Sequence, residues 1–203
     1  MPKLVLTSQL QAKAMMRKMH KNLANLNLDD LKKCVPEQLQ THSVTAVLLA
    51  LGSNYQAEKY LSLIREKLAV LGEIQLSTAF QNPDFTATPE LPKPDYTNQC
   101  VYLTLTSAMT LQQLQQTFKK FESDCGRQRS SESIKNPMKI VTMDIDILLI
   151  RLDDKQNSLS KNIASKKIVE NSKQWIIMAD RYPFKAHERA GIEELVLNSY
   201  SKS

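Results

Sequence analysis

The chain of 203 residues contains little glycine, cysteine or tryptophan, and it lacks a long hydrophobic run. Its three cysteines, Cys34, Cys100 and Cys125, are odd in number and far apart, which excludes a disulfide framework and a zinc site built on cysteine. The longest early apolar run, residues 44–51, is too short to span a bilayer, and the N-terminus does not resemble a signal peptide. We therefore expect a cytoplasmic protein that makes no use of a membrane.

The composition is that of a soluble globular protein, with 42% hydrophobic and 24% charged residues. The net charge of +6 is unevenly placed, because residues 1–43 hold seven basic and three acidic side chains. The excess of positive charge therefore says little about the ligand of the rest of the chain. We divide the sequence into an N-terminal helical extension, residues 1–43, and a main domain, residues 44–203.

The extension is predicted to contain a helix over residues 8–27. An apolar stripe faces a basic one in this segment: Met16, Met19, Leu23 and Leu26 lie opposite Lys13, Arg17, Lys18 and Lys21. Such a helix could bind nucleic acid or an acidic membrane, but docking on its own domain or on a second subunit is the commoner use. The protein is accordingly expected to be a monomer or a homodimer formed through this helix. A second helical piece is predicted over residues 28–39, disturbed by Pro36.

The main domain shows alternating strand and helix patterns. Strands are predicted at residues 44–51, 73–80, 98–106 and 143–150, with helices at 57–71 and from Thr110 to Gly126. This β-α-β-β-α-β order predicts an α+β fold, a ferredoxin-like sandwich with one antiparallel sheet and two helices on one side. A last strand at 175–179 and a short element at 192–197 follow. Residues 81–94 hold four prolines and are expected to form a functional loop.

Two carboxylates interrupt the apolar strand at residues 143–150. Asp144 and Asp146 are two positions apart, so their side chains point to the same face of the strand. Like charges so close at the edge of a core repel, and a divalent cation such as Mg²⁺ would remove that cost. The alternative is a strand with one solvated face.

Four short segments stand out in the main domain: Ala50-Leu51-Gly52-Ser53-Asn54, Pro94-Asp95-Tyr96-Thr97-Asn98, Glu122-x-x-x-Gly126-Arg127-x-Arg129 and Asp144-x-Asp146-Ile147-Leu148. Together they resemble the 6-hydroxymethyl-7,8-dihydropterin pyrophosphokinase family. The resemblance covers about residues 44–150. It implies transfer of an intact diphosphate from ATP to a pterin hydroxymethyl group in folate biosynthesis, with release of AMP and with two Mg²⁺ ions. It implies no nucleic-acid partner.

The resemblance also assigns site residues. Asp144 and Asp146 would hold the metal ions, and Asp144 would also help to deprotonate the hydroxymethyl group. Arg127 and Arg129 would clamp the triphosphate, unless they only complement the helix end. Glu122 would face the nucleotide, with a solvated helix position as the alternative. The pterin positions are Asn82, Pro83, Phe85, Tyr96 and Asn98, although Tyr96 could instead be core and Asn98 a strand entry.

The sequence departs from the family at three places. Val141 stands where an arginine is usual, and Lys139 is the nearest cation that could replace it. The loop before the aspartates lacks the usual tryptophan. The downstream His-Tyr pair has no clear counterpart, so Lys185, His187 and Arg189 are candidates there. A homologue that binds nucleotide or pterin with weak or no catalysis is therefore the alternative function. A nucleic-acid-binding module is a third, disfavoured because the first strand has no stacking aromatics and the aspartates would repel phosphates.

Overall fold

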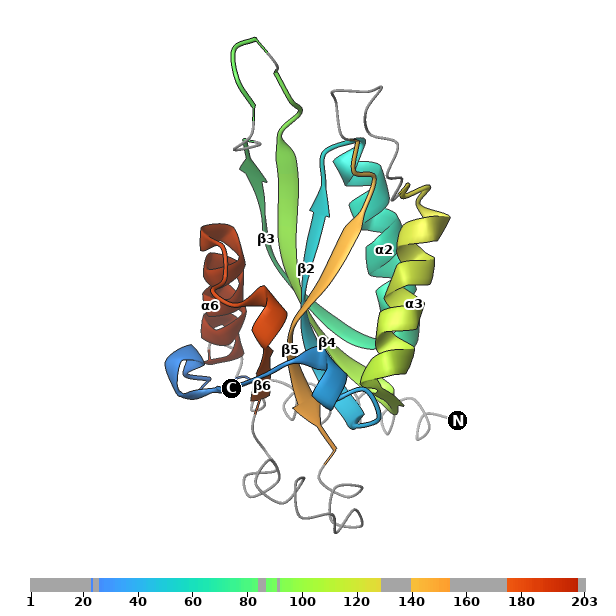
Figure 1. The fold of residues 1–203 in the computed structure, drawn as a ribbon, viewed down its shortest axis with the longest axis vertical. Coiled ribbons are helices and arrows are strands. Elements are labelled where there is room, and N and C mark those ends of the chain that lie inside the picture. Colours follow the sequence, from blue (N-terminus) through green and yellow to red (C-terminus); the bar gives the residue numbers. More distant parts are fainter. Residues whose placement is uncertain are drawn as a thin grey trace, which may run out of the picture.

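A computed structural model describes residues 23, 26–83, 87–90, 92–128, 140–153 and 175–200. Within these residues the protein is an α+β structure with a six-stranded mixed sheet and three α-helices (Figure 1). The strand order across the sheet is β1-β6-β5-β2-β4-β3. The strands are β1 (Lys32–Cys34), β2 (Ser43–Ser53), β3 (Gly72–Asn82), β4 (Tyr96–Thr110), β5 (Asp144–Leu152) and β6 (Trp175–Met178), and the helices are α2 (Ala57–Leu71), α3 (Leu111–Asp124) and α6 (Ala186–Tyr200).

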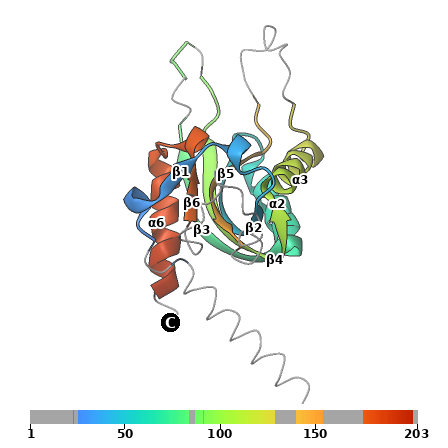
Figure 2. The ribbon, with the colours of Figure 1, turned by 60° about the horizontal axis from the view of Figure 1, so that its bottom comes forward.

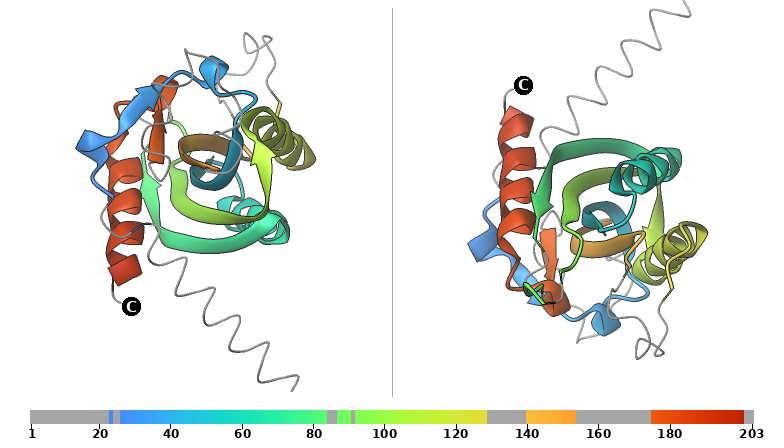
Figure 3. Two further views of the ribbon diagram at one scale, coloured as in Figure 1. Left: turned by 90° about the horizontal axis from the view of Figure 1, so that it is seen from below. Right: turned by 90° about the horizontal axis from the view of Figure 1, so that it is seen from above.

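The helices cover both faces of the sheet. Helices α2 and α3 lie on one face and α6 lies on the other, as the end-on views show (Figure 3). Each face has its own apolar cluster. The cluster under α2 and α3 includes Leu61, Ile64 and Phe118, whereas the cluster under α6 includes Tyr102 and Ile192. Burial on both faces explains why β2 is an almost continuous apolar run.

The order β2-α2-β3-β4-α3-β5 reproduces the predicted order of elements. Helix α2 has the predicted bounds, and α3 begins after Thr110 with a capping box formed with Gln113. The predicted strands are present, and β4 is longer at both ends than residues 98–106. The prediction of an exclusively antiparallel sheet was wrong, because β1 pairs in parallel with β6 at the sheet edge (Figure 2).

Strand β5 carries the two aspartates beside the centre of the sheet. It pairs with β2 from Gly52↔Asp144 to Val44↔Leu152, and the register shifts between Leu48 and Leu49. Because this bulge breaks the alternation of side chains, Leu148 and Leu149 both join the cluster under α6, whereas Ile145 and Ile147 join the other. Asp144 and Asp146 alternate with Ile145 and Ile147, so they face the α6 side.

The predicted helix over residues 28–39 was wrong. This segment consists of two 3-10 turns, η1 (Leu28–Asp30) and η2 (Pro36–Gln38), on either side of β1. The Asn27 side chain caps η1, and Pro36 occupies the first position of η2, where its missing N–H costs nothing. Between the two turns, residues 32–34 form a strand because they pair with β6, which is remote in sequence.

The last element is longer than predicted. Instead of a short element at residues 192–197, α6 has fifteen residues. Its buried positions include Glu188, Gly191 and Ser199 as well as Ile192 and Leu195, so the apolar stripe is weak in the sequence. Gly191 lets α6 approach β4, because a Cβ atom there would lie 2.6 Å from the Cys100 sulfur.

Most of the helix predicted at residues 8–27 lies outside the described residues. Leu23 is fully buried, and Leu26 packs against the same cluster under α6. Cys34, Cys100 and Cys125 are buried and unpaired. Among the described helices, none has the length and apolar character needed to cross a bilayer.

Candidate active site

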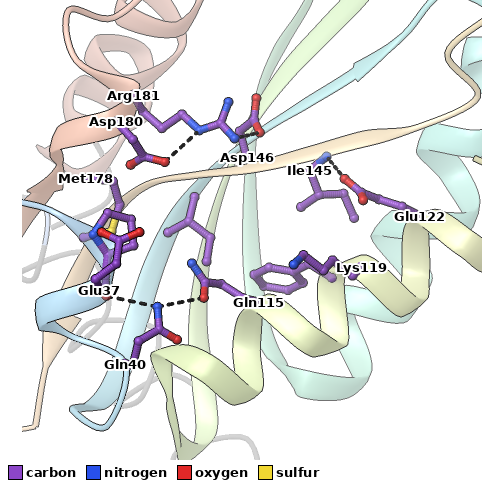
Figure 4. Close-up of a pocket in the computed structure, with 13 residues that line it drawn as sticks. Glu37, Gln40, Gln115, Lys119, Glu122, Ile145, Asp146, Met178, Asp180 and Arg181 are labelled. Atoms are coloured by element: carbon purple, nitrogen blue, oxygen red, sulfur yellow. Dashed lines mark hydrogen bonds and ion pairs between the residues drawn. The ribbon is translucent and has the colours of Figure 1, made fainter. Parts of the chain in front are cut away.

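Two cavities meet at Asp146. One, the loop-side pocket, has a volume of about 390 Å³ and is lined by Ala50, Leu51, Gly52, Asn82, Pro83, Tyr96, Asn98, Asp144, Asp146, Lys185, His187 and Glu188. The other, the helix-side pocket, has a volume of about 330 Å³ and lies between α3, β5, η2 and the 3-10 turn η4 (Ala179–Arg181) (Figure 4). Asp146 lines both, so this residue lies at the junction of the two cavities.

The two carboxylates differ in their surroundings. The Asp146 side chain is 13% exposed and that of Asp144 is 36% exposed. Burial, and after it the negative charge of Asp144, raises the pKa of Asp146 to about 6, although Arg181 and Lys185 oppose the shift. The pair therefore concentrates negative charge where the protein solvates it poorly, which favours a cation beside it.

Arg127 follows α3 and reaches toward Asp144. Its side chain is only 9% exposed, and its Nη2 lies 4.0 Å from Asp144 Oδ1. Nη1 donates to the backbone oxygen of Gln128, whereas the buried Nε has no acceptor within the described part of the chain. A buried N–H without an acceptor is costly, and an anionic ligand beside Arg127 would satisfy it.

Four of the five predicted pterin positions line the loop-side pocket together. Asn82 ends β3, Pro83 follows it, and Tyr96 and Asn98 begin β4, where Asn82 pairs with Tyr96. Gly52 lies opposite Asn98 on β2, and a Cβ atom there would be 3.1 Å from the Asn98 side-chain oxygen. Glycine thus leaves room for the Asn98 amide at the wall. Phe85 lies outside the described residues.

Glu122 lines the helix-side pocket near the end of α3. It is 3% exposed, so the alternative of a solvated helix position was wrong. One carboxylate oxygen accepts a hydrogen bond from the backbone N–H of Ile145 at 2.9 Å (Figure 4). Glu122 therefore joins the end of α3 to the strand that carries the aspartates.

The turn after β2 forms hydrogen bonds with Val141, which lies shortly before the aspartates in the chain. The side-chain oxygen of Asn54 accepts from Val141 N–H at 2.6 Å, and the Asn54 N–H donates to the Val141 oxygen. Ser53 Oγ donates to that same oxygen. Asn54, Ser53 and Val141 are all buried. The segment Gly52-Ser53-Asn54 thus fixes the start of β5 beside the pockets.

We predict that Asn54→Ala destabilises the protein by about 1–3 kcal/mol, because the buried Val141 N–H loses its acceptor. Urea unfolding followed by circular dichroism measures this change. The exposed helix position Gln112 provides the control, and Gln112→Ala is expected to stay within about 0.5 kcal/mol. Equal stabilities of the two variants would contradict the role given to Asn54.

The structure also brings together residues that the sequence did not identify. Arg181 Nη2 lies 2.6 Å from Asp146 Oδ1, so Arg181 is a cation beside the aspartates where Val141 replaces the usual arginine. Glu188 is buried, lines the loop-side pocket and accepts from Lys185 N–H at 2.8 Å. Both lie far along the chain from Asp144, so no local pattern marked them.

The three downstream candidates separate in the structure. Lys185 and His187 line the loop-side pocket, and burial lowers the pKa of His187. Arg189 is exposed, and its Nε lies 2.9 Å from Glu193 Oε1 one helical turn away. Two predicted phosphate-binding residues, Arg129 and Lys139, lie outside the described residues.

The donor set beside Asp146 fits Mg²⁺. The described residues contain no group of three or more His, Cys, Asp or Glu side chains that could cage a metal ion. Mg²⁺ typically uses one or two carboxylates and takes its other oxygens from water and substrate phosphates. Asp144 and Asp146, on one strand face, supply such a pair.

The comparison with family models gave one match. The model described as 7,8-dihydro-6-hydroxymethylpterin-pyrophosphokinase (HPPK) matches residues 48–175, which include β5 and most of the residues lining the two pockets. No curated protein matches the chain.

Proposed function

Because the chain belongs to the 7,8-dihydro-6-hydroxymethylpterin-pyrophosphokinase family, we propose that it transfers diphosphate from ATP to 6-hydroxymethyl-7,8-dihydropterin. The products would be AMP and the pterin diphosphate, a step of folate biosynthesis. The observation that carries the proposal is the position of Asp146 at the junction of two cavities. We also propose that residues 44–203 form the pyrophosphokinase-like domain, with a ferredoxin-like unit from β2 to β5, and that residues 1–43 form an extension before it.

The loop-side pocket is the proposed pterin site. The pterin ring is flat and carries amide-like donors and acceptors along one edge, which suit the side-chain amides of Asn82 and Asn98. Tyr96, Pro83 and the backbone around Gly52 supply surfaces for its faces. The hydroxymethyl arm would then point toward Asp144.

The helix-side pocket is the proposed nucleotide site, with the triphosphate at the Asp146 end. Asp144 and Asp146 would hold two Mg²⁺ ions, whose charge neutralises the phosphates and makes the β-phosphorus open to attack. Arg127 would donate its Nε–H to a phosphate oxygen, and Arg181 pairs with Asp146.

In the proposed reaction the hydroxymethyl oxygen forms a bond to the β-phosphorus. The bond from that phosphorus to the oxygen of the α-phosphate breaks, and AMP leaves with this oxygen. Asp144, the more exposed carboxylate, accepts the hydroxyl proton. The protein contributes alignment and charge, because this class of transfer needs little covalent chemistry from side chains.

The test is formation of AMP from ATP and 6-hydroxymethyl-7,8-dihydropterin with the full-length protein, with and without Mg²⁺. We expect AMP and pterin diphosphate in equal amounts, and loss of both products in EDTA. Absence of AMP at any Mg²⁺ concentration would refute the enzymatic function.

A homologue with weakened catalysis is the second candidate. Arg181 already pairs with Asp146 at 2.6 Å, and Val141 provides no cation in the position where the family has one. Such a protein would bind Mg·ATP or the pterin in a titration without producing AMP. The same assay, read together with binding, therefore separates the two functions.

A further inference from the structure

The segment before the family match forms one wall of the helix-side pocket. Pro36, Glu37 and Gln40 line this cavity, and they precede residue 48, where the match begins. Figure 4 shows Gln40 beside Gln115 of α3, with Glu37 close by and Asp146 on the other side of β5. The cavity therefore has one end near Asp146 and Arg181 and a distal end made partly by the N-terminal segment.

Hydrogen bonds hold this wall firmly on α3. The first two backbone N–H groups of α3, those of Leu111 and Gln112, donate to the oxygens of His42 and Gln40. These donors have no partner inside the helix, so the N-terminal segment satisfies them. Leu39 is fully buried in the core cluster under α2 and α3. The wall is thus part of the folded structure.

The contacts of Gln40 determine what Gln115 presents to the cavity. The Gln40 amide nitrogen donates at 3.0 Å to the Pro36 oxygen, which can only accept. The same nitrogen donates at 3.0 Å to the side-chain oxygen of Gln115. With its oxygen engaged, Gln115 turns its NH₂ group away from Gln40, as Figure 4 shows. The distal end therefore offers a donor from Gln115 and acceptors from the Glu37 carboxylate.

Apolar side chains occupy the space between the polar groups. Pro36, Phe118, Ile147 and Met178 line the same cavity. A flat aromatic ring packs well on such a surface, with its edge reaching the polar groups. Adenine fits this pattern, because its amino group donates while the neighbouring ring nitrogen accepts.

We infer that the N-terminal segment selects the base of the nucleotide, with Glu37 accepting from the adenine amino group and Gln115, oriented by Gln40, donating to the ring. The inference rests on the proposed function, since it places the base at the end of the cavity opposite the metal-binding carboxylates. Inosine nucleotides carry a carbonyl oxygen in place of the amino group, and the Glu37 carboxylate would repel that oxygen.

Calorimetric titration of the full-length protein with Mg·ATP and Mg·ITP, without pterin, tests the inference. We expect the wild-type protein to bind ATP roughly 10- to 100-fold more tightly than ITP, as for other polar contacts to a base edge. Glu37→Gln adds an N–H donor, so it should weaken ATP binding, strengthen ITP binding and reduce the ratio at least about 10-fold. Gln40→Ala should also reduce the ratio, because Gln115 is then free to rotate.

Glu66→Gln is the matched control, because Glu66 is exposed on α2 and lines neither pocket. The ratio of ATP to ITP affinity in this variant should equal that of the wild type. A purely structural role of the wall would weaken both nucleotides alike, so an unchanged ratio in Glu37→Gln would overturn the inference. A wild-type ratio near one would overturn it as well. Failure to bind either nucleotide would overturn the proposed function and the inference together, whereas AMP formation with an unchanged ratio would overturn the inference alone.

Discussion

Replacing Asp146 by asparagine is expected to lower the rate of diphosphate transfer by about 10³-fold, because the variant loses one of the two charges that hold the metal-bound triphosphate. This factor corresponds to about 4 kcal/mol of transition-state stabilisation. Asp146 contacts both cavities, so the loss should fall on kcat as well as on ATP binding. Steady-state measurement of AMP release at saturating pterin gives both quantities.

The same substitution should stabilise the protein in EDTA above pH 6. Because the folded state raises the pKa of Asp146 from 3.8 to about 6, ionisation at neutral pH costs folding free energy. That cost is absent below the unfolded pKa of 3.8, grows as the pH rises from there to the folded pKa, and is complete above about pH 6. Asparagine resembles the protonated form and does not ionise. The free energy of unfolding of Asp146→Asn, relative to that of the wild type, should therefore rise by about 2–3 kcal/mol from pH 4 to pH 8.

Asp124 provides the control for this substitution. It is an exposed carboxylate on α3, paired with Lys67 at 2.7 Å and remote from both cavities. Asp124→Asn should retain the wild-type rate and change stability only slightly, because an exposed ion pair contributes little. If Asp146→Asn retained full activity, the aspartate pair would have no part in catalysis.

Replacing Arg127 by alanine is the second change with a large expected effect. The side chain is buried next to Asp144, and its Nε has no acceptor in the described structure, so it is poised to bind an anionic ligand. We expect kcat to fall by about 10²- to 10³-fold, below the range for arginines that act directly on phosphoryl transfer. Single-turnover measurement of AMP formation reports this loss apart from product release.

Arg127→Lys separates charge from geometry at this position. Lysine retains the positive charge but cannot make the two parallel hydrogen bonds of a guanidinium group, so only about a tenfold recovery over alanine is expected. The stability of both variants should remain close to that of the wild type, because Nε has no acceptor in the described structure to lose and the bond from Nη1 to the Gln128 oxygen is exposed. A kcat unchanged in Arg127→Ala would remove Arg127 from the proposed triphosphate site.

The sequence predicted the elements whose signals are local. Helix α2 and the central strand β2 carry strong apolar patterns, and Thr110 with Gln113 marks the start of α3. Segment 28–39 was predicted wrongly because its strand exists only through pairing with β6, more than 140 residues later. Helix α6 was too short in the prediction because polar and small residues occupy its buried face.

The residues of the candidate site also divide into those with a local signal in the sequence and those without one. The aspartate pair was visible from its spacing on a strand, and the loop residues were suggested by the family resemblance. Arg181 and Gln40 were not identified, since each acts on a partner that is distant in sequence. Glu188 was not identified, since only the fold brings it to the pocket that the aspartates line. Their contributions follow from the tertiary fold and not from a motif.

The N-terminal segment accepts hydrogen bonds from the first backbone N–H groups of α3. This contact affects how fragments of the protein should be designed. The family match starts inside β2 and stops at the first residue of β6. A fragment trimmed to those limits would begin partway along the central strand, open the end of a helix to solvent and leave a sheet edge bare. The smallest autonomous unit is therefore set by hydrogen bonding and extends beyond the part that similarity to relatives can recognise.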